Sequence, residues 1–198
     1  MMKKTILLLG GARSGKSRLA QEMAQRISAR VLYVATATAG DADMQQRIIR
    51  HRKERPGSWQ TLEASCNLGQ AISGYTSDCD VVLIDCITLL VNNIFCLHDD
   101  KQFAEIDETI LDNEVQQEIT DLINCIRSTT ASFIIVSNET GLGLVPENRM
   151  GRLYRDCLGR ANQSLAQIAD EVYFLVAGIP VRIKPPNDFT TFPANPSL

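Results

Sequence analysis

The chain has 198 residues, of which 44% are hydrophobic and 22% are charged. This composition is typical of a globular protein and excludes intrinsic disorder. The length predicts one domain, which can bury roughly 70% of its unfolded surface without disulfides. The formal net charge is -3, which argues against a general nucleic-acid-binding protein, because such proteins hold phosphates with a basic surface.

Cysteine occurs six times, at positions 66, 79, 86, 96, 125 and 157, with no C-x-x-C pair. The spacing fits neither a zinc site nor a secreted disulfide framework. An apolar run follows Lys3 and Lys4, but it is too short for a signal peptide. No stretch approaches the ~18 apolar residues of a membrane span. We therefore expect reduced thiols, a cytoplasmic location and no membrane span.

Short apolar runs alternate with longer amphipathic stretches. In chain order we expect a strand at 5–9, a helix at 16–29, a strand at 31–35, a helix at 42–55, a strand at 60–63, a helix at 68–75, a strand at 81–84, a helix at 112–127, a strand at 133–136, a helix at 149–168, and a hairpin of strands at 172–176 and 181–183. This alternation predicts an α/β fold with a mostly parallel sheet, helices on both faces and a C-terminal antiparallel hairpin. We expect a single domain over residues 1–184 and an extended or poorly ordered, proline-rich tail over 185–198.

A phosphate-loop motif lies between the first expected strand and the first expected helix. The pattern G-x-x-x-x-G-K-[ST] is matched by Gly10, Gly11, Ala12, Arg13, Ser14, Gly15, Lys16 and Ser17. In such a loop the glycines let the backbone wrap the phosphates, and the amides of the helix N-terminus point at the anion. We expect Lys16 to reach the β- and γ-phosphate oxygens and the Ser17 hydroxyl to bind Mg²⁺.

An acidic residue, Asp85, follows the buried strand at 81–84. A carboxylate at this place binds the Mg²⁺ of the nucleotide directly or through water. Capping a helix that begins near Ile87 is an alternative role, and it is compatible with the first. Together the two motifs predict a nucleoside-triphosphate-dependent enzyme without identifying its substrate. A signalling GTPase is disfavoured, because no N-K-x-D follows a later strand and the D-x-x-G at 156–159 falls inside an expected helix.

Five basic residues lie within positions 47–55 and surround His51. Nearby positive charges lower the pKa of a histidine, and a neutral imidazole can attack phosphorus. The residues alone leave two interpretations open, a nucleophile and a solvated basic helix face. The other histidine, His98, precedes two aspartates in an acid-rich segment, and we expect it to be a solvated surface side chain.

Several ordered blocks resemble one family, the bifunctional adenosylcobinamide kinase/adenosylcobinamide-phosphate guanylyltransferases of cobalamin synthesis. Besides the phosphate loop, the blocks are residues 33–37, 51–52 with 55–56, 59–63, 83–89, 136–143, 152–156, 159–163 and 177–180. They extend over most of the chain, so the ordered set is far more specific than a phosphate loop alone. It favours the nucleophile interpretation of His51.

The resemblance implies two reactions. A nucleoside triphosphate, ATP or GTP, phosphorylates the hydroxyl of the aminopropanol arm of adenosylcobinamide. GTP then guanylylates a histidine with loss of pyrophosphate, and the GMP passes to adenosylcobinamide phosphate to give adenosylcobinamide-GDP. The resemblance also implies a RecA-like phosphate-loop fold and a homotrimer with sites near subunit boundaries.

The resemblance implies roles for individual residues as well. By position, His51 matches the guanylylated histidine of the family. The nucleotide contacts map onto the phosphate loop from Gly10 to Ser17, with Lys16 catalytic, and onto Ala35, Thr36, Ala37, Arg52, Lys53, Glu54, Arg55, Glu63 and Asp85. Ser17 and Asp85 are the expected Mg²⁺ ligands. The spacing does not distinguish Asp85 from Glu63 as the base of the kinase step.

Two other functions fit the phosphate loop and Asp85. A different small-metabolite kinase would use both but would form no covalent nucleotide. A RecA-type regulatory or assembly ATPase would have no small-molecule acceptor, and its slow hydrolysis would be stimulated by a macromolecular partner. The net negative charge counts against DNA as that partner.

Overall fold

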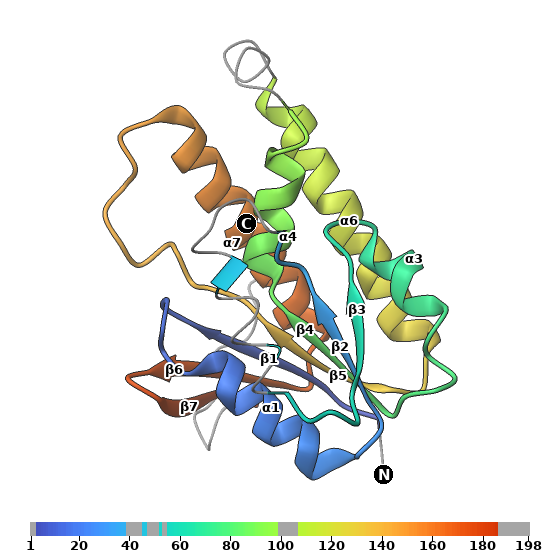
Figure 1. Ribbon diagram of the computed structural model, residues 1–198. Helices are drawn as coiled ribbons and strands as arrows, with labels where there is room; N and C mark the ends of the chain where they lie inside the picture. The colour runs from blue at the N-terminus through green and yellow to red at the C-terminus, as the bar shows by residue number, and fades with distance from the viewer. Residues whose placement is uncertain (1–2, 39–44, 47–51, 53–54, 99–106, 186–198) are drawn as a thin grey trace.

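Seven strands form one sheet at the centre of the computed structural model, which describes residues 3–38, 45–46, 52, 55–98 and 107–185 (Figure 1). All neighbouring pairs are parallel except β6 and β7, which form an antiparallel hairpin. Across the sheet the order is β3-β2-β4-β5-β1-β6-β7. The strands are β1 (Thr5–Gly10), β2 (Val31–Ala35), β3 (Gln60–Glu63), β4 (Val81–Asp85), β5 (Ser132–Val136), β6 (Glu171–Val176) and β7 (Ile179–Lys184).

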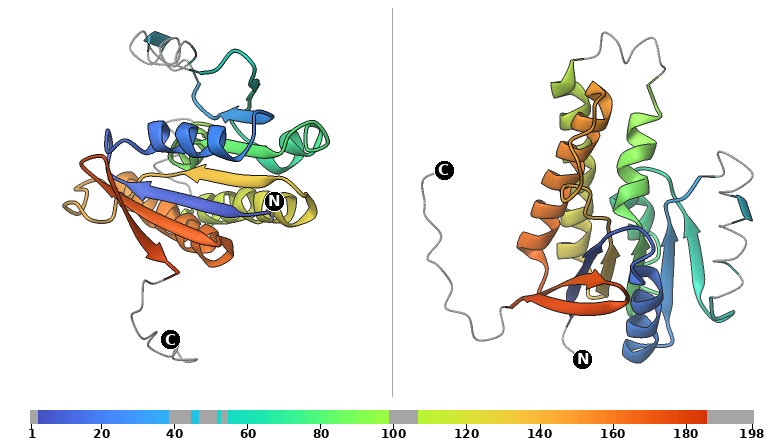
Figure 2. Two further views of the ribbon diagram at one scale, coloured as in Figure 1. Left: turned by 90° about the horizontal axis from the view of Figure 1, so that it is seen from below. Right: turned by 90° about the vertical axis from the view of Figure 1, so that its left-hand side faces the viewer.

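Helices cover both faces of the sheet, because successive strand residues point to opposite sides. Leu7 and Leu9 of β1 belong to a core formed with four helices on one face. Ile6 and Leu8 belong to a second core on the other face, formed with α1. Figure 2 shows α1 on one side of the sheet and α6 and α7 on the other. The helices are α1 (Lys16–Ile27), α3 (Leu68–Ser73), α4 (Ile87–Phe95), α6 (Glu108–Ser128) and α7 (Arg149–Ile168).

This architecture confirms the predicted fold, a mostly parallel sheet with helices on both faces and a C-terminal antiparallel hairpin. The segment 156–159 lies within α7, as expected. Most of the helix predicted at 42–55 lies outside the described residues, and so does the tail beyond Pro185. No helix in the described part of the chain has both the length and the apolar character needed to cross a bilayer.

Helix α4 is missing from the expected elements, although a helix that begins near Ile87 was considered as one that Asp85 could cap. Seven of its nine residues are buried, and a short apolar run directly after a buried strand cannot be assigned to a helix or a strand by its pattern alone. Helix α6 begins at Glu108 rather than at residue 112, because the Asp107 carboxylate accepts a hydrogen bond from the Thr109 amide at 2.9 Å and caps it. His98 is more enclosed than predicted, since its side chain is 19% exposed and its Nε2 lies 2.8 Å from Glu114.

The buried carboxylate of Glu118 on α6 caps the neighbouring helix α3. It accepts hydrogen bonds from the backbone amides of Asn67 and Leu68, both at 2.8 Å. We expect Glu118→Ala to lower the free energy of unfolding by about 3 kcal/mol, because two amides lose a charged acceptor. Urea denaturation measures this loss. Asp121→Ala on the same helix is the control, because the exposed Asp121 side chain bonds only Gln117 in the described structure, and it should change stability by less than ~0.5 kcal/mol.

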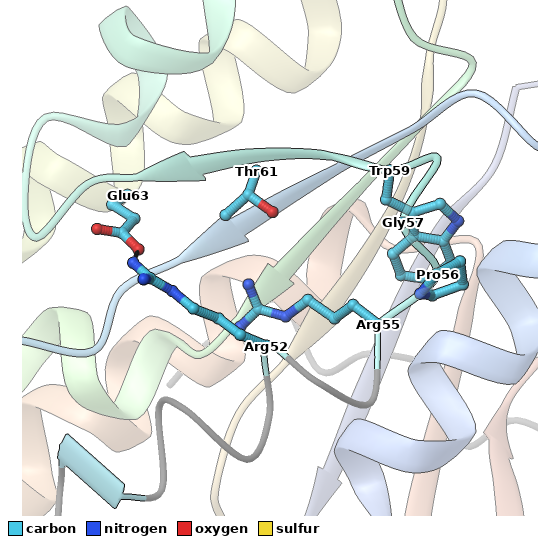
Figure 3. A pocket seen from close by; sticks show the side chains of 7 residues that line it. All are labelled: Arg52, Arg55, Pro56, Gly57, Trp59, Thr61 and Glu63. Carbon is cyan, nitrogen blue, oxygen red and sulfur yellow. Dashed lines mark hydrogen bonds and ion pairs between the residues drawn. The ribbon is translucent and has the colours of Figure 1, made fainter.

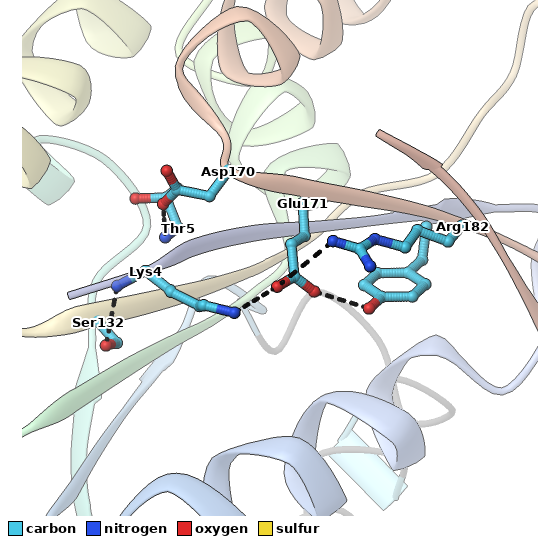
Figure 4. A network of polar contacts seen from close by, with 7 residues as sticks. Lys4, Thr5, Ser132, Asp170, Glu171 and Arg182 are labelled. Atoms are coloured by element: carbon cyan, nitrogen blue, oxygen red, sulfur yellow. Dashed lines mark hydrogen bonds and ion pairs between the residues drawn. The ribbon is translucent and has the colours of Figure 1, made fainter. Parts of the chain in front are cut away.

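A polar network joins β1, β6 and β7 at one end of the sheet (Figure 4). The Glu171 carboxylate accepts a hydrogen bond from Lys4 Nζ at 2.6 Å and one from Tyr173 Oη at 2.7 Å. Hydrogen bonding by Lys4, and then by Tyr173, holds the pKa of Glu171 below its ordinary value. Asp170 accepts from the Thr5 amide at 2.7 Å. These contacts fix the amino end of β1 and so help to hold the loop that follows the strand.

Candidate active site

The predicted site residues meet at the carboxyl edge of the sheet. Ala35, the last residue of β2, is in register with Glu63 of β3 and with Asp85 of β4. The phosphate loop begins at Gly10, the last residue of β1. Strand β5 separates β1 from β4, so the ends of these strands are two strand spacings apart, roughly 10 Å. A bound metal or water fits between the loop and Asp85 better than a direct contact would.

Left-handed backbone shapes the phosphate loop. Gly10 has φ 146°, Arg13 has φ 58° and Gly15 has φ 94°. Two neighbouring segments hold the loop, since Gly178 N donates to Ser14 O at 3.0 Å and Glu139 N donates to Gly10 O at 3.1 Å. The hairpin between β6 and β7 is therefore part of the support of the loop.

Lys16 lies folded across the loop that it belongs to. Its ammonium donates to Gly10 O at 2.9 Å, to Gly11 O at 2.6 Å and to Ser14 Oγ at 3.3 Å, and the residue is only 6% exposed. Gly15, the N-cap of α1, has no side chain to cap the first-turn amides, so these amides remain available to an anion. The loop is therefore a ready binding site for phosphate groups.

Gly10 allows the loop to pass close to β6. A Cβ at this position would lie 2.6 Å from Leu175 O, and the φ is unfavourable for any side chain. We expect Gly10→Ala to lower the free energy of unfolding by about 2–4 kcal/mol. Gly11→Ala is the control, because a Cβ there meets no described atom within 4 Å. Its free energy of unfolding should lie within ~0.5 kcal/mol of the wild-type value. Equal losses in the two variants would contradict this account.

Asp85 is the last residue of β4 and is half-buried. Its Oδ2 accepts a hydrogen bond from Tyr33 Oη at 2.7 Å. The suggestion that Asp85 caps a helix is wrong, because Cys86 occupies the N-cap of α4. Burial, and secondarily the Asp85 charge, raise the pKa of the Cys86 thiol to about 11, while Lys16 acts in the opposite direction.

The segment after β2 is held against the start of α4. Thr36 is fully buried, and its hydroxyl donates to Cys86 O at 2.8 Å and accepts from Cys86 N at 2.7 Å. Asn93 Nδ2 donates to Thr36 O at 2.8 Å. The Thr36 hydroxyl is therefore occupied by hydrogen bonds to the backbone of Cys86, whereas Ala37 is partly exposed.

A pocket of about 380 Å³ lies beside β3, on the same face of the sheet as α1 (Figure 3). Alternate residues of this edge point into it, which follows from the two-residue period of a strand. Arg52 forms an exposed ion pair with Glu63. The lining residues are Arg52, Arg55, Pro56, Gly57, Trp59, Thr61 and Glu63.

Arg55 enters the pocket by lying on an aromatic ring. Its guanidinium carbon is 3.5 Å from the centroid of the Tyr33 ring. Its Nε and Nη1 are buried and have no hydrogen-bond partner among the described residues. Buried donor nitrogens that have no acceptor among the described residues are costly, so these two nitrogens are well suited to an anionic ligand.

The structure thus places Ala35, Glu63 and Asp85 together at the carboxyl ends of neighbouring strands. Arg52 and Arg55 lie in the pocket beside β3, and three strands separate β3 from β1, which leads into the phosphate loop. His51, Lys53 and Glu54 lie outside the described residues. The sequence analysis did not identify Tyr33, Trp59 and Thr61 as site residues. For Trp59 and Thr61 the sequence did contain a signal, because they alternate with Glu63 along one edge strand.

The donor set suits a magnesium ion that arrives with its nucleotide. Among the residues that the structure describes, no three acidic, histidine or cysteine side chains group to hold a metal. Mg²⁺ is commonly bound by one or two protein oxygens together with phosphates and water. Asp85 and the partly exposed Ser17 supply oxygens of this kind, so the site fits the ion only in company with a triphosphate.

Comparison with known proteins assigns the chain. A family model described as cobinamide kinase / cobinamide phosphate guanyltransferase matches residues 6–183. The chain belongs to this cobinamide kinase/guanyltransferase family. The bifunctional adenosylcobalamin biosynthesis protein CobU of Escherichia coli (strain K12) is 42% identical over 180 residues, which cover 90% of this chain and 99% of CobU. CobP of Pseudomonas aeruginosa, named in the same way, is 39% identical over 178 residues, 90% of this chain and 96% of CobP.

A solved structure with a partial likeness is that of the RadB recombinase. It aligns with a TM-score of 0.45 and 14% identity over 86% of this chain and 73% of the RadB chain. Membership of the cobinamide kinase/guanyltransferase family confirms the predicted enzyme class, a kinase and nucleotidyltransferase. Neither a simple metabolite kinase nor a regulatory ATPase accounts for the second of these activities.

Proposed function

We propose that this enzyme phosphorylates adenosylcobinamide and then transfers GMP to the product through a guanylylated His51. In the first reaction the hydroxyl of the aminopropanol arm attacks the γ-phosphorus of ATP or GTP. The bond between that phosphorus and the β-γ bridging oxygen breaks, the hydroxyl proton leaves, and a nucleoside diphosphate is released. Catalysis of such a step is mainly positioning and charge stabilisation, for which Lys16 and the first-turn amides of α1 are suited.

In the second reaction a nitrogen of His51 attacks the α-phosphorus of GTP. The bond between the α- and β-phosphates breaks, and pyrophosphate leaves. A phosphate oxygen of adenosylcobinamide phosphate then attacks the same phosphorus, and the P–N electron pair returns to the imidazole. A covalent intermediate divides the transfer into two displacements, so two large substrates can use the site in turn.

The observation that carries this proposal is the Arg55 guanidinium, whose Nε and Nη1 have no hydrogen-bond partner among the described residues, in a pocket on the face of the sheet that α1 covers. Arg52 and Arg55 line that pocket, and α1, the helix that follows the phosphate loop, packs on the same face of the sheet. We assign the loop to the β- and γ-phosphates in both reactions. The pocket then receives the nucleotide carried by His51, and its arginines balance the charge of the α-phosphate.

Magnesium would be held by Ser17 and Asp85 together with the triphosphate. The ion would neutralise charge on the β- and γ-phosphate oxygens. The role of the chain is to orient one oxygen of Ser17 and one of Asp85, and Tyr33 contributes by donating a hydrogen bond to Asp85 Oδ2.

We also propose a cytoplasmic homotrimer. All six cysteines are free thiols, which suits a reducing compartment. The exposed apolar side chains of Ile179, Val181 and Ile183 on the edge strand β7 offer a surface for a second copy of the chain. Sedimentation equilibrium at micromolar concentration tests the assembly, and a monomer or dimer mass would contradict it.

The test of the two reactions uses the purified chain, Mg²⁺ and adenosylcobinamide. With γ-labelled ATP, we expect label in adenosylcobinamide phosphate. With α-labelled GTP and no acceptor, we expect label that stays on denatured protein and is released by acid but not by alkali. Adding adenosylcobinamide phosphate should move this label into adenosylcobinamide-GDP. Folded protein that binds GTP but never becomes labelled would contradict the covalent mechanism.

A further inference from the structure

One buried tyrosine, Tyr33, touches both parts of the candidate active site. The residue is 1% exposed. Its hydroxyl donates to Asp85 Oδ2 at 2.7 Å, and its ring carries the Arg55 guanidinium at 3.5 Å. Asp85 belongs to the phosphate-loop side of the site and Arg55 to the pocket beside β3. Among the contacts of the described residues, Tyr33 is the side chain that joins these two groups.

The hydroxyl of Tyr33 fixes the direction of the Asp85 carboxylate. A phenol is a hydrogen-bond donor at neutral pH, and the Tyr33 hydroxyl donates to Asp85 Oδ2. Its bond occupies one carboxylate oxygen and limits rotation of the side chain. A carboxylate held in this way presents its other oxygen in a constant direction.

The ring of Tyr33 sets the position of Arg55. The guanidinium carbon lies 3.5 Å from the ring centroid, while Nε and Nη1 of Arg55 have no hydrogen-bond partner in the described structure. Trp59 packs beside the ring, with centroids 6.5 Å apart and planes 28° apart. Arg52 differs, because it is paired with Glu63. Among the contacts of the described residues, the cation–π contact with Tyr33, rather than an ion pair, orients Arg55.

We propose that Tyr33 is a positioning residue for both transfer reactions: its hydroxyl orients Asp85 for the metal-nucleotide, and its ring holds Arg55 for the nucleotide in the pocket. This inference rests on the proposed function. It assigns separate tasks to two parts of one side chain, so two substitutions can separate them. Tyr33→Phe removes only the hydroxyl, and Tyr33→Leu removes the hydroxyl and the ring.

The test follows Mg²⁺-dependent turnover of ATP, with and without adenosylcobinamide, and GTP binding. Binding is measured by quenching of Trp59, the only tryptophan of the chain, which lines the pocket. We expect Tyr33→Phe to lower kcat about tenfold and to raise the Mg²⁺ concentration for half-maximal rate, with GTP affinity unchanged. Tyr33→Leu should show both effects and also bind GTP about fivefold more weakly.

Rates are expressed per GTP-binding site, so a misfolded fraction changes neither kcat nor the Mg²⁺ midpoint. Tyr173→Phe is the matched control: it removes a hydroxyl that donates to a carboxylate at the same 2.7 Å, but in the network at the other end of the sheet. It should behave as wild type. Wild-type Mg²⁺ dependence in Tyr33→Phe, or wild-type GTP affinity in Tyr33→Leu, would overturn the inference. Failure of the wild type to modify adenosylcobinamide would instead overturn the proposed function. The positioning role of Tyr33 would still be tested by ATP hydrolysis and GTP binding.

Discussion

Replacing Lys16 with methionine is expected to abolish most of both transfer activities. The substitution keeps the length of the side chain and removes the ammonium. That ammonium lies against Gly10 O and Gly11 O, within the loop to which the proposed mechanism assigns the β- and γ-phosphates. Loss of one preorganised charge donor from a transition state costs about 10²–10³-fold in kcat. Steady-state rates of phosphoryl transfer and of GMP transfer measure the loss.

The two reactions should fall together in Lys16→Met. Phosphoryl transfer develops charge on the oxygen between the β- and γ-phosphates, and guanylylation releases pyrophosphate from the same end of the nucleotide. A lysine at the β- and γ-phosphates therefore stabilises both leaving groups. If GMP transfer kept its rate while phosphoryl transfer was lost, the two reactions would use different triphosphate sites.

Lys184→Met is the control for folding. Lys184 Nζ also donates to two backbone carbonyls, Ala166 O at 2.8 Å and Gln167 O at 2.9 Å, but it lies at the end of β7. Both variants lose contacts of the same kind, and Gly10 O still accepts from the Glu139 amide in Lys16→Met. Similar shifts in Tm with a loss of activity in Lys16→Met alone are the expected result.

The phosphate loop and Asp85 were predictable because each is local in the sequence. A glycine-rich segment between an apolar strand and a helix identifies the loop, and a short apolar run identifies the strand that ends at Asp85. The parallel register then places Asp85 beside Ala35 without further information. The same local pattern was not enough for α4, because its short and mostly buried apolar run directly follows a buried strand.

The pocket beside β3 depends on contacts between distant segments. Tyr33 looks like an ordinary buried strand residue in the sequence, and nothing nearby indicates that it bonds Asp85 and supports Arg55. No spacing of residues along the sequence indicates a stacking contact of this kind. The fold creates this stacking. Helix α1 packs on β1, β4 and β5, whereas the ring of Tyr33 on β2 is contacted by Trp59 and Arg55.

His51→Ala is expected to eliminate the labelling of the protein by α-labelled GTP. It should reduce GMP transfer to adenosylcobinamide phosphate to background, because no other group forms the intermediate in the proposed mechanism. Phosphoryl transfer from ATP to adenosylcobinamide should stay within about threefold of wild type, since that reaction proceeds by direct attack on the γ-phosphorus. Acid release of the label from wild type, measured beside the variant, identifies the bond as P–N.

His98→Ala is the matched control, because His98 is the other of the two histidines of the chain and pairs with Glu114 on α6. It should be labelled as wild type is. Lys16→Met and His51→Ala should therefore differ. The lysine substitution should lower the rates of both phosphoryl transfer and GMP transfer, whereas His51→Ala should lower only the rate of GMP transfer. Label that persists in His51→Ala and disappears in His98→Ala would transfer the nucleophilic role to His98. Label that persists in both would place the GMP on a residue that is not histidine.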